Sequence, residues 1–160
     1  MKIGVISDTH YKAFTEYSLP SWIVGAFESV DMIFHAGDLT DFDLVNDLSA
    51  IAPVYAVKGN MDEYRSDLPP FREIEIQSGF SVAVAHIKAE AYSRKSNSCS
   101  MIIHGHTHVP EFVKSAGMWF LNPGSPSSPR GNSEASVAIL TISASIPEVE
   151  FIKRPLSATL

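Results

Sequence analysis

Short apolar runs alternate with polar turns along the whole chain, and their lengths are those of β-strands. Valine and isoleucine, which favour extended backbone, are common in them. The runs are Ile3–Ser7, Met32–His35, Val54–Val57, Phe80–Ala85, Met101–Ile103, Met118–Leu121, Val137–Ser143 and Val149–Lys153. The early runs are continuously apolar instead of alternating, which indicates strands that are buried on both faces.

Segments with the apolar period of a helix separate the first three runs. One is Ser18–Glu28, with a serine at its start and an early proline, and the other is Asp41–Ala50, whose acidic first turn suits the positive end of a helix dipole. This β-α-β-α-β order predicts parallel strands joined by right-handed crossovers. The second half is mostly strand, with a weak helical segment at Lys88–Ser96, and we expect antiparallel pairing there.

The chain is long enough for one hydrophobic core, because 160 residues bury about two-thirds of the surface that they expose when unfolded. The stretch Asn122–Asn132 is rich in proline, serine and glycine, but it is short and a strand follows soon after it. It therefore predicts an ordered loop rather than a domain linker. We expect a single domain over residues 1–160.

Composition narrows the range of partners. The formal net charge is −6 and the 12 lysines and arginines form no basic run, which argues against long nucleic acid or an anionic membrane. The single cysteine, Cys99, excludes an internal disulfide and a cysteine-rich metal site. The first run reaches Asp8 too soon for a signal peptide, and no apolar stretch approaches the roughly 20 residues of a spanning helix. A cytoplasmic protein is expected, and a homo-oligomer is left open.

Side chains that bind metals follow five of the predicted strands. They are, in chain order, Asp8 with His10, then Asp38, then Asn60 with Asp62, then His86, and finally His104, His106 and His108. Open α/β sheets place their ligand sites at the carboxyl ends of strands, so we expect these side chains to lie close together. Loop capping, which aspartate and asparagine also favour, is the alternative interpretation. Oxygen and nitrogen donors without a thiolate favour Mn, Fe, Ni, Co or catalytic Zn over structural zinc.

The size of the set indicates two ions. Its candidate metal ligands are Asp8, His10, Asp38, Asn60, His86, His106 and His108. Seven side chains suit two ions that share one carboxylate, roughly 3.5–4 Å apart, with a bridging hydroxide. Two divalent ions bring four positive charges, of which the two aspartates and the hydroxide neutralise three, so the site keeps about one positive charge. This favours an anionic substrate, and hence phosphoester hydrolysis over amide or ester hydrolysis.

In this order, the blocks Asp8-x-His10, Gly37-Asp38, Gly59-Asn60, His86 and Gly105-His106-Thr107-His108 resemble those of the calcineurin-like metallophosphoesterases. The likeness is greatest to the minimal single-domain phosphodiesterases of that superfamily, and it extends over residues 1–130, with the segment Leu121–Ser125 included. The resemblance implies a four-layer α/β/β/α sandwich, in which two mixed sheets are flanked by helices.

The resemblance also implies roles for these residues. One ion would be held by Asp8, His10 and His108, a second by Asn60, His86 and His106, and Asp38 would bridge both. Manganese is the first expectation for the metal, with nickel, iron, cobalt or zinc as alternatives. The bridging hydroxide would attack phosphorus in line. The candidate catalytic residues are Asp38, Asn60 and His104, and Asn60 and Arg130 are the candidates for binding substrate, although Arg130 also fits a solvated loop cation.

The chain departs from the pattern of that superfamily at two places. Met61 stands where many members have a histidine that protonates the leaving group, so good leaving groups or another acid, such as Asp62 or His104, become requirements. Many members also have Gly-His after the ligand that aligns with His86, where this chain has Ile87 and Lys88.

These observations favour an enzyme that hydrolyses a small phosphoester, as a phosphodiesterase or, alternatively, a phosphomonoesterase. A second hypothesis is a binding scaffold that resembles a retromer subunit, in which degraded ligands leave a surface for partners. The presence of His10, His106 and His108 argues against it. A third is a metallohydrolase that acts on a carbon centre.

Overall fold

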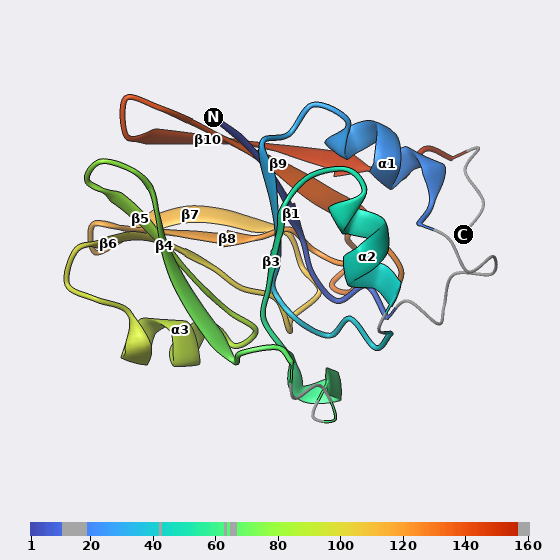
Figure 1. Ribbon diagram of the computed structural model, residues 1–160, viewed down its shortest axis with the longest axis horizontal. Helices are drawn as coiled ribbons and strands as arrows, with labels where there is room; N and C mark the ends of the chain where they lie inside the picture. Colours follow the sequence, from blue (N-terminus) through green and yellow to red (C-terminus); the bar gives the residue numbers. More distant parts are fainter. Residues whose placement is uncertain (11–18, 42, 63, 65–66, 157–160) are drawn as a thin grey trace.

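Two five-stranded β-sheets form most of the structure, a computed structural model that describes residues 1–10, 19–41, 43–62, 64 and 67–156 (Figure 1). The first sheet has the order β10-β9-β1-β2-β3, and the second has the order β4-β5-β6-β8-β7. The strands are β1 Lys2–Ile6, β2 Met32–His35, β3 Val54–Ala56, β4 Phe71–Gln77, β5 Phe80–Ala85, β6 Cys99–Ile103, β7 Glu111–Ser115, β8 Met118–Asn122, β9 Ser136–Ser143 and β10 Ile146–Lys153.

The apolar strands form the core because they bury both faces of each sheet. Ile3 and Val5 of β1 are fully buried in a cluster with Val82 and Val84 of β5, so the inner faces of the two sheets pack on each other. Successive side chains of a strand point to opposite faces. Accordingly, Ile6 belongs to a second cluster on the outer face of the first sheet.

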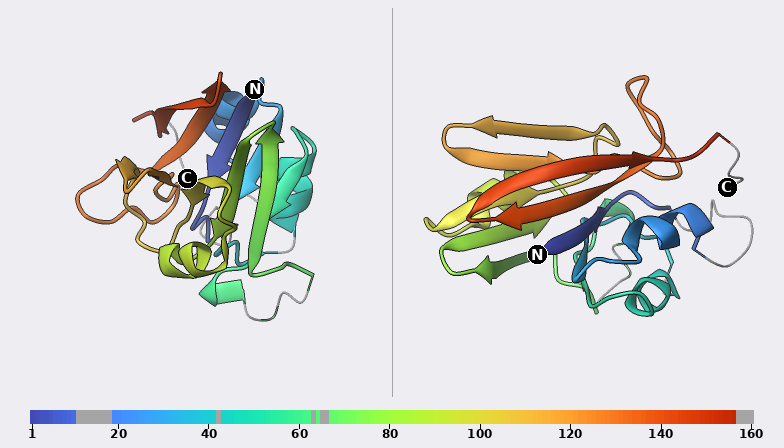
Figure 2. Two further views of the ribbon diagram at one scale, coloured as in Figure 1. Left: turned by 90° about the vertical axis from the view of Figure 1, so that its left-hand side faces the viewer. Right: turned by 90° about the horizontal axis from the view of Figure 1, so that it is seen from above.

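Helices cover the two outer faces. Among the described residues, the α-helices are α1 Ser21–Phe27, α2 Asp43–Ser49 and α3 Lys88–Arg94. The first two pack on the first sheet, whereas Ala91 of α3 packs on the outer face of the second (Figure 2). The four-layer α/β/β/α arrangement expected from the sequence is therefore present. Among the described residues, no helix has both the length and the apolar content to span a membrane.

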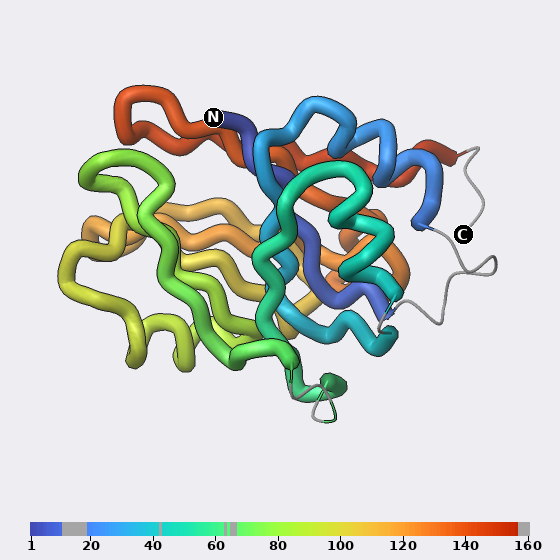
Figure 3. Tube along the Cα trace, viewed as in Figure 1, coloured from blue at the N-terminus to red at the C-terminus, as the bar shows by residue number. Residues whose placement is uncertain are grey.

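The predicted strand directions are right for the first half and partly wrong for the second. Strands β1, β2 and β3 are parallel as predicted, and β9 joins β1 in antiparallel pairing, which brings the first strand of the chain beside a late one (Figure 3). In the second sheet, however, β5, β6 and β8 are parallel. The reason is that β8, and not β7, pairs with β6 in the sheet. The pattern of strands along the chain does not reveal this spatial order.

The sequence reasoning missed β4 and β7, which are the two edge strands of the second sheet. Strand β4 alternates charged and apolar residues, and the last three residues of β7 are exposed. Edge strands tolerate such polar sequences because one side of the strand faces solvent. The helical segments were predicted correctly, with bounds that differ by a few residues, and the predicted Ser18 start lies outside the described residues.

Replacement of Phe27 by alanine should lower the free energy of unfolding by roughly 3–5 kcal/mol, because it removes a fully buried ring. The ring fills the space above Gly4, where an added Cβ would lie 2.9 Å from its Cδ1 atom. Urea unfolding followed by circular dichroism measures the change. The control is Val24→Ala on the same helix, where the side chain is 40% exposed and a change below about 1 kcal/mol is expected. Equal losses for the two variants would contradict this packing.

Candidate metal centre

The turns that follow β1, β2, β3, β5 and β6 meet at one end of the two sheets, and they carry all seven candidate ligands. The rings of His10 and His108 lie 5.3 Å apart, and those of His86 and His106 lie 5.2 Å apart, measured between centroids. Asn60, in the short 3₁₀ helix η2 (Asn60–Asp62), places its Oδ1 atom 3.2 Å from Nδ1 of His106. The structure therefore brings together residues from separate parts of the chain.

The carboxylate of Asp8 lies at the centre of this group and is fully buried. Its Oδ2 atom accepts hydrogen bonds from the Ser7 hydroxyl at 2.8 Å and from the His106 amide at 3.0 Å. Its Oδ1 atom lies 3.2 Å from Nε2 of His108 and 3.9 Å from Nε2 of His86. One oxygen thus holds two turns in place, while the other faces the imidazoles.

Two polar atoms at this centre are buried without a hydrogen-bond partner. Within the part of the chain that the structure describes, they are Oδ1 of Asp8 and Nε2 of His86. Buried polar groups are nearly always paired, and an unpaired one calls for a reason such as an ion. A carboxylate oxygen and an imidazole nitrogen are ordinary ligands of divalent transition metals, so the residues present fit such ions.

Backbone carbonyls orient two of the imidazoles. Nδ1 of His86 donates to the Ala36 carbonyl at 2.8 Å, and Nδ1 of His108 donates to the Ser128 carbonyl at 2.6 Å. Each bond fixes the ring and leaves Nε2 directed at the centre. Histidines that bind metals use the same arrangement, because a fixed outer hydrogen bond sets both tautomer and direction.

The ligand atoms fall into two overlapping groups. Those of Asp8, His10 and His108 lie within 4.8 Å of one another, as do those of Asp8, Asp38 and His86. The first group is the one that the resemblance assigns to one ion. Asp8 is common to both groups, whereas Asp38 belongs to the second, with its Oδ2 atom 3.3 Å from Nε2 of His86 and its other oxygen accepting a hydrogen bond from the Met61 amide at 2.8 Å. The number of ions and the assignment of each ligand stay predictions.

The backbone around the candidate ligands is strained at some positions and tightly packed at two glycines. Five of the seven have a positive φ, namely Asp8, His10, Asp38, His106 and His108. Non-glycine residues in this region cost free energy and cluster at functional sites. Two glycines of the motifs are needed for a different reason. A Cβ at Gly59 would lie 2.1 Å from Oδ1 of Asp38, and one at Gly105 would lie 1.9 Å from the Ser7 hydroxyl.

Asp38 and His86 shift each other's protonation. Burial favours the neutral Asp38 carboxyl, but the His86 imidazole 3.3 Å away and a hydrogen bond from the Met61 amide outweigh it, so the pKa of Asp38 lies below its ordinary value. Burial likewise favours neutral His86, yet the nearby Asp38 carboxylate raises the pKa of His86 above the ordinary value. Without metal, this pair therefore favours a protonated imidazole beside a carboxylate. A metal ion that uses Nε2 of His86 must displace that proton.

Several residues support the site without belonging to the ligand set. Asp62 is buried and accepts hydrogen bonds from the amides of Leu39, Thr40 and Gly59, so it joins the turn after β2 to that after β3. This is the turn-capping role that its position suggested. His35 accepts from the Gly37 amide and contacts the Thr9 hydroxyl, and it thus braces the turns that carry Asp8 and Asp38.

The structure gives His104 and Arg130 positions away from the centre of the ligand group. The buried His104 ring lies against Glu111, 3.1 Å from its Oε2 atom, and against the Gly105 carbonyl. Burial lowers the pKa of His104. Arg130 is exposed, and its backbone amide donates to the His108 carbonyl. The catalytic role of His104 and the substrate role of Arg130 stay predictions.

Sequence reasoning missed the supporting hydrogen bonds that Asn122 and Ser125 make to the turns of the site. Ser125 donates from its hydroxyl to the Asp8 carbonyl at 2.7 Å, and Asn122 donates to the Gly105 carbonyl at 2.9 Å and the Thr107 hydroxyl at 3.0 Å. Both lie in the segment Leu121–Ser125 that the resemblance includes. The resemblance points to this segment of the sequence, but it does not reveal which residues the segment contacts, because those residues lie elsewhere in the chain.

Comparison with known proteins agrees with this geometry. Residues 1–145 match the family model of the calcineurin-like phosphoesterase superfamily domain, and the chain belongs to that superfamily. A probable metallophosphoesterase of Methanothermobacter thermautotrophicus is 38% identical over 164 residues, which cover 96% of this chain and 92% of the relative. The two mixed sheets and the candidate ligand groups agree with membership of this superfamily.

Solved structures show the same fold. A predicted phosphoesterase from Streptococcus pneumoniae has a TM-score of 0.73 at 26% identity, with 99% of this chain and 95% of that chain covered. Vps29 of Entamoeba histolytica, solved as a complex with Zn²⁺, also has a TM-score of 0.73, at 23% identity, with 96% of this chain and 99% of that chain covered. The second likeness concerns the fold alone.

Manganese should stabilise the protein by occupying the unpaired ligands. At a Mn²⁺ concentration about 100 times Kd, we expect the melting temperature to rise by roughly 5–10 °C. Differential scanning fluorimetry measures the shift. Asp8→Asn should abolish it, whereas Asp31→Asn, at an exposed carboxylate on the surface, should keep it. An unchanged shift in Asp8→Asn would show that the ion binds elsewhere.

Proposed function

We propose that the protein is a dinuclear metal-dependent phosphoesterase, acting as a phosphodiesterase on a small phosphoester. The observation that carries the proposal is the pair of unpaired buried atoms, Oδ1 of Asp8 and Nε2 of His86, surrounded by further imidazoles and a second carboxylate. Divalent ions held by these ligands polarise phosphoryl oxygens and activate water for in-line attack. Manganese is the first candidate, because the donors are carboxylate oxygens and imidazole nitrogens.

The burial of the ligands defines the side from which a substrate approaches. Asp8, Asp38, His86 and His108 are buried, whereas Asn60 and His106 are exposed. The phosphoryl group therefore meets the site at Asn60 and His106, and Asn60 offers an amide that can donate to a phosphoryl oxygen. Exclusion of water behind this open side strengthens electrostatic interactions with the anion.

The charge balance of the protein favours a small substrate. The site is positive once loaded, but the chain as a whole carries a net charge of −6. A polyanion would meet repulsion over the rest of the surface, whereas a single phosphodiester reaches the site alone. A nucleotide or another small phosphoester meets both conditions.

Hydrolysis of bis-p-nitrophenyl phosphate in Mn²⁺ or Ni²⁺ tests the proposal. Asp38→Ala and His106→Ala should each lower kcat/KM by at least about 100-fold. Each substitution removes a candidate ligand of the ions that stabilise the charge of the transition state. The matched surface control is again Asp31→Asn. Release of p-nitrophenolate is followed by absorbance.

Two results would contradict the proposal. One is the absence of activity with all of the candidate metals in protein that binds them. The other is activity that both variants retain. A protein that folds fully without metal and stays inactive after each candidate metal is added would instead favour a binding scaffold. The likeness to Vps29 supplies the fold for that alternative.

Met61 gives a second test, because a thioether cannot protonate a leaving group. It is 54% exposed next to Asn60, and its amide bonds Asp38, so its side chain can change without loss of that bond. Met61→His should raise kcat for diphenyl phosphate, which has a basic leaving group, by roughly 100-fold and change bis-p-nitrophenyl phosphate hydrolysis little. Met61→Gln, similar in size but without an acid, should leave both rates near wild type. Equal effects of the two substitutions would contradict this role.

A further inference from the structure

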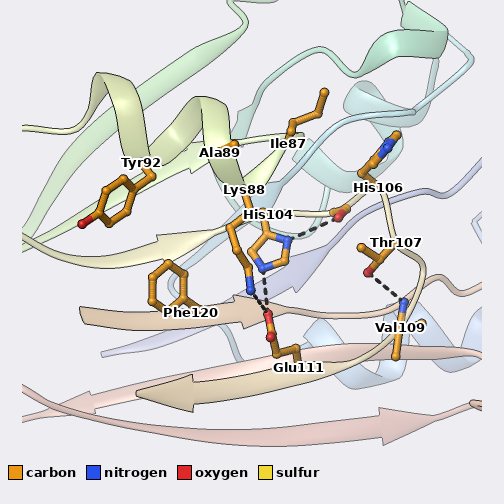
Figure 4. Close-up of a pocket in the computed structure, with 11 residues that line it drawn as sticks. Ile87, Lys88, Ala89, Tyr92, His104, His106, Thr107, Val109, Glu111 and Phe120 are labelled. Atoms are coloured by element: carbon orange, nitrogen blue, oxygen red, sulfur yellow. Dashed lines mark hydrogen bonds and ion pairs between the residues drawn. The ribbon is translucent and has the colours of Figure 1, made fainter. Parts of the chain in front are cut away.

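A pocket of about 750 Å³ opens beside the metal centre (Figure 4). Four of the residues that line it carry rings, namely Tyr92, Phe120, His104 and His106, and Ile87 and Val109 add aliphatic wall. Pockets of this size that are mostly apolar, with a few polar groups, bind small organic molecules. The number of rings favours a flat aromatic ligand, because stacked and edge-to-face contacts between rings add to the gain from burial.

The pocket adjoins the candidate metal centre at His106. His106 belongs to the ligand set and also lines the pocket, and Ile87 and Lys88 follow directly after His86. A molecule with its phosphoryl group at His106 therefore has its organic part within reach of α3. Ile87 and Lys88 are also the positions at which the sequence departs from the pattern of many superfamily members.

A polar group of fixed orientation lies among these apolar walls. Oε2 of Glu111 accepts from Nζ of Lys88 at 2.5 Å and lies 3.1 Å from Nε2 of His104. Nζ of Lys88 also lies 4.9 Å from the centre of the Phe120 ring. Figure 4 shows the three polar side chains converging below α3.

The second oxygen of Glu111 is available to a ligand. Its side chain is 33% exposed, and no described residue hydrogen-bonds Oε1. Burial favours the neutral carboxyl, but the bond and the charge of Lys88 outweigh it and hold the pKa of Glu111 below its ordinary value. The group is therefore an acceptor, and it favours a ligand that presents an N–H or O–H donor.

We propose that this pocket binds a nucleobase that carries an amino group, with the ring among Tyr92, Phe120 and His104 and the amino group donating to Oε1 of Glu111. The substrate of the neighbouring site is then a nucleotide phosphoester. This last step rests on the function proposed above, whereas binding of the base needs no metal.

Adenosine and purine riboside form the matched pair of probes, since they differ by one amino group. In metal-free protein, millimolar adenosine should shift the amide resonances of α3 and of residues 104–111 in ¹H–¹⁵N NMR spectra. Adenosine should bind about tenfold more tightly than purine riboside, the effect of one hydrogen bond to a charged acceptor. Equal affinities, or shifts confined to another face, would overturn the proposal.

Variants on the exposed side of α3 separate binding from folding. Ala89→Trp should fill the pocket, Tyr92→Ala should remove a ring, and each should weaken adenosine binding by at least about fivefold, an effect of ordinary size for one aromatic contact. Both side chains are exposed, so the fold tolerates the changes. Ile146→Ala, at an exposed position on β10, is the control that should keep wild-type affinity. Unchanged affinity in both pocket variants would contradict the site.

The p-nitrophenyl ester of adenosine 5′-phosphate then distinguishes the two proposals. Adenosine binding without hydrolysis of this ester by metal-loaded protein would sink the proposed function and leave the base pocket standing. Hydrolysis with the same KM as methyl p-nitrophenyl phosphate would support the function and reject the pocket. A KM at least about tenfold lower for the nucleoside ester supports both.

Discussion

The buried carboxylate of Asp8 is the constraint on which the rest of the site depends. One of its oxygens is bonded to Ser7 and to the His106 amide, and the carbonyl of the same residue accepts from Ser125. These bonds join the turns that follow β1, β6 and β8. The other oxygen has no hydrogen-bond partner in the described structure. Burial of a carboxylate oxygen without a hydrogen-bond partner is costly, and a bound cation removes that cost.

The fold supplies this arrangement because parallel strands end at the same edge of a sheet. Two sheets that pack face to face bring two such edges together, so ligands from both can surround one space. Asp62 and His35 then fix the turns through backbone amides instead of through contacts with the ligands. Stability and function are linked here, because the strained φ angles at Asp8 and Asp38 persist only while the surrounding bonds hold.

Much of the first sheet, and the convergence of the candidate ligands at the ends of its strands and of β5 and β6, could be predicted from the sequence for physical reasons. Continuous apolar runs such as Ile3–Ile6 specify buried strands, and ligand types placed after them specify a site at their ends. The edge strands β4 and β7 were missed because their exposed side allows charged residues. The parallel pairing of β6 with β8 depends on strand order, which is a property of the whole sheet.

The supporting residues and the pocket were harder to predict, since their roles come from contacts between distant parts of the chain. Ser125 meets Asp8 across 117 positions, and Glu111 on β7 meets Lys88 on α3 across 23. The sequence shows neither contact. It does show that Ile87 and Lys88 depart from the pattern of the superfamily, and the structure places both in the wall of the pocket beside His106.

Anomalous scattering from crystals grown with Mn²⁺ tests the central claim most directly. The account predicts two peaks roughly 3.5–4 Å apart, one within bonding distance of Asp8, His10 and His108 and the other beside Asp38 and His86. A single peak, or peaks outside this group of side chains, would contradict a dinuclear centre built on the buried carboxylate of Asp8.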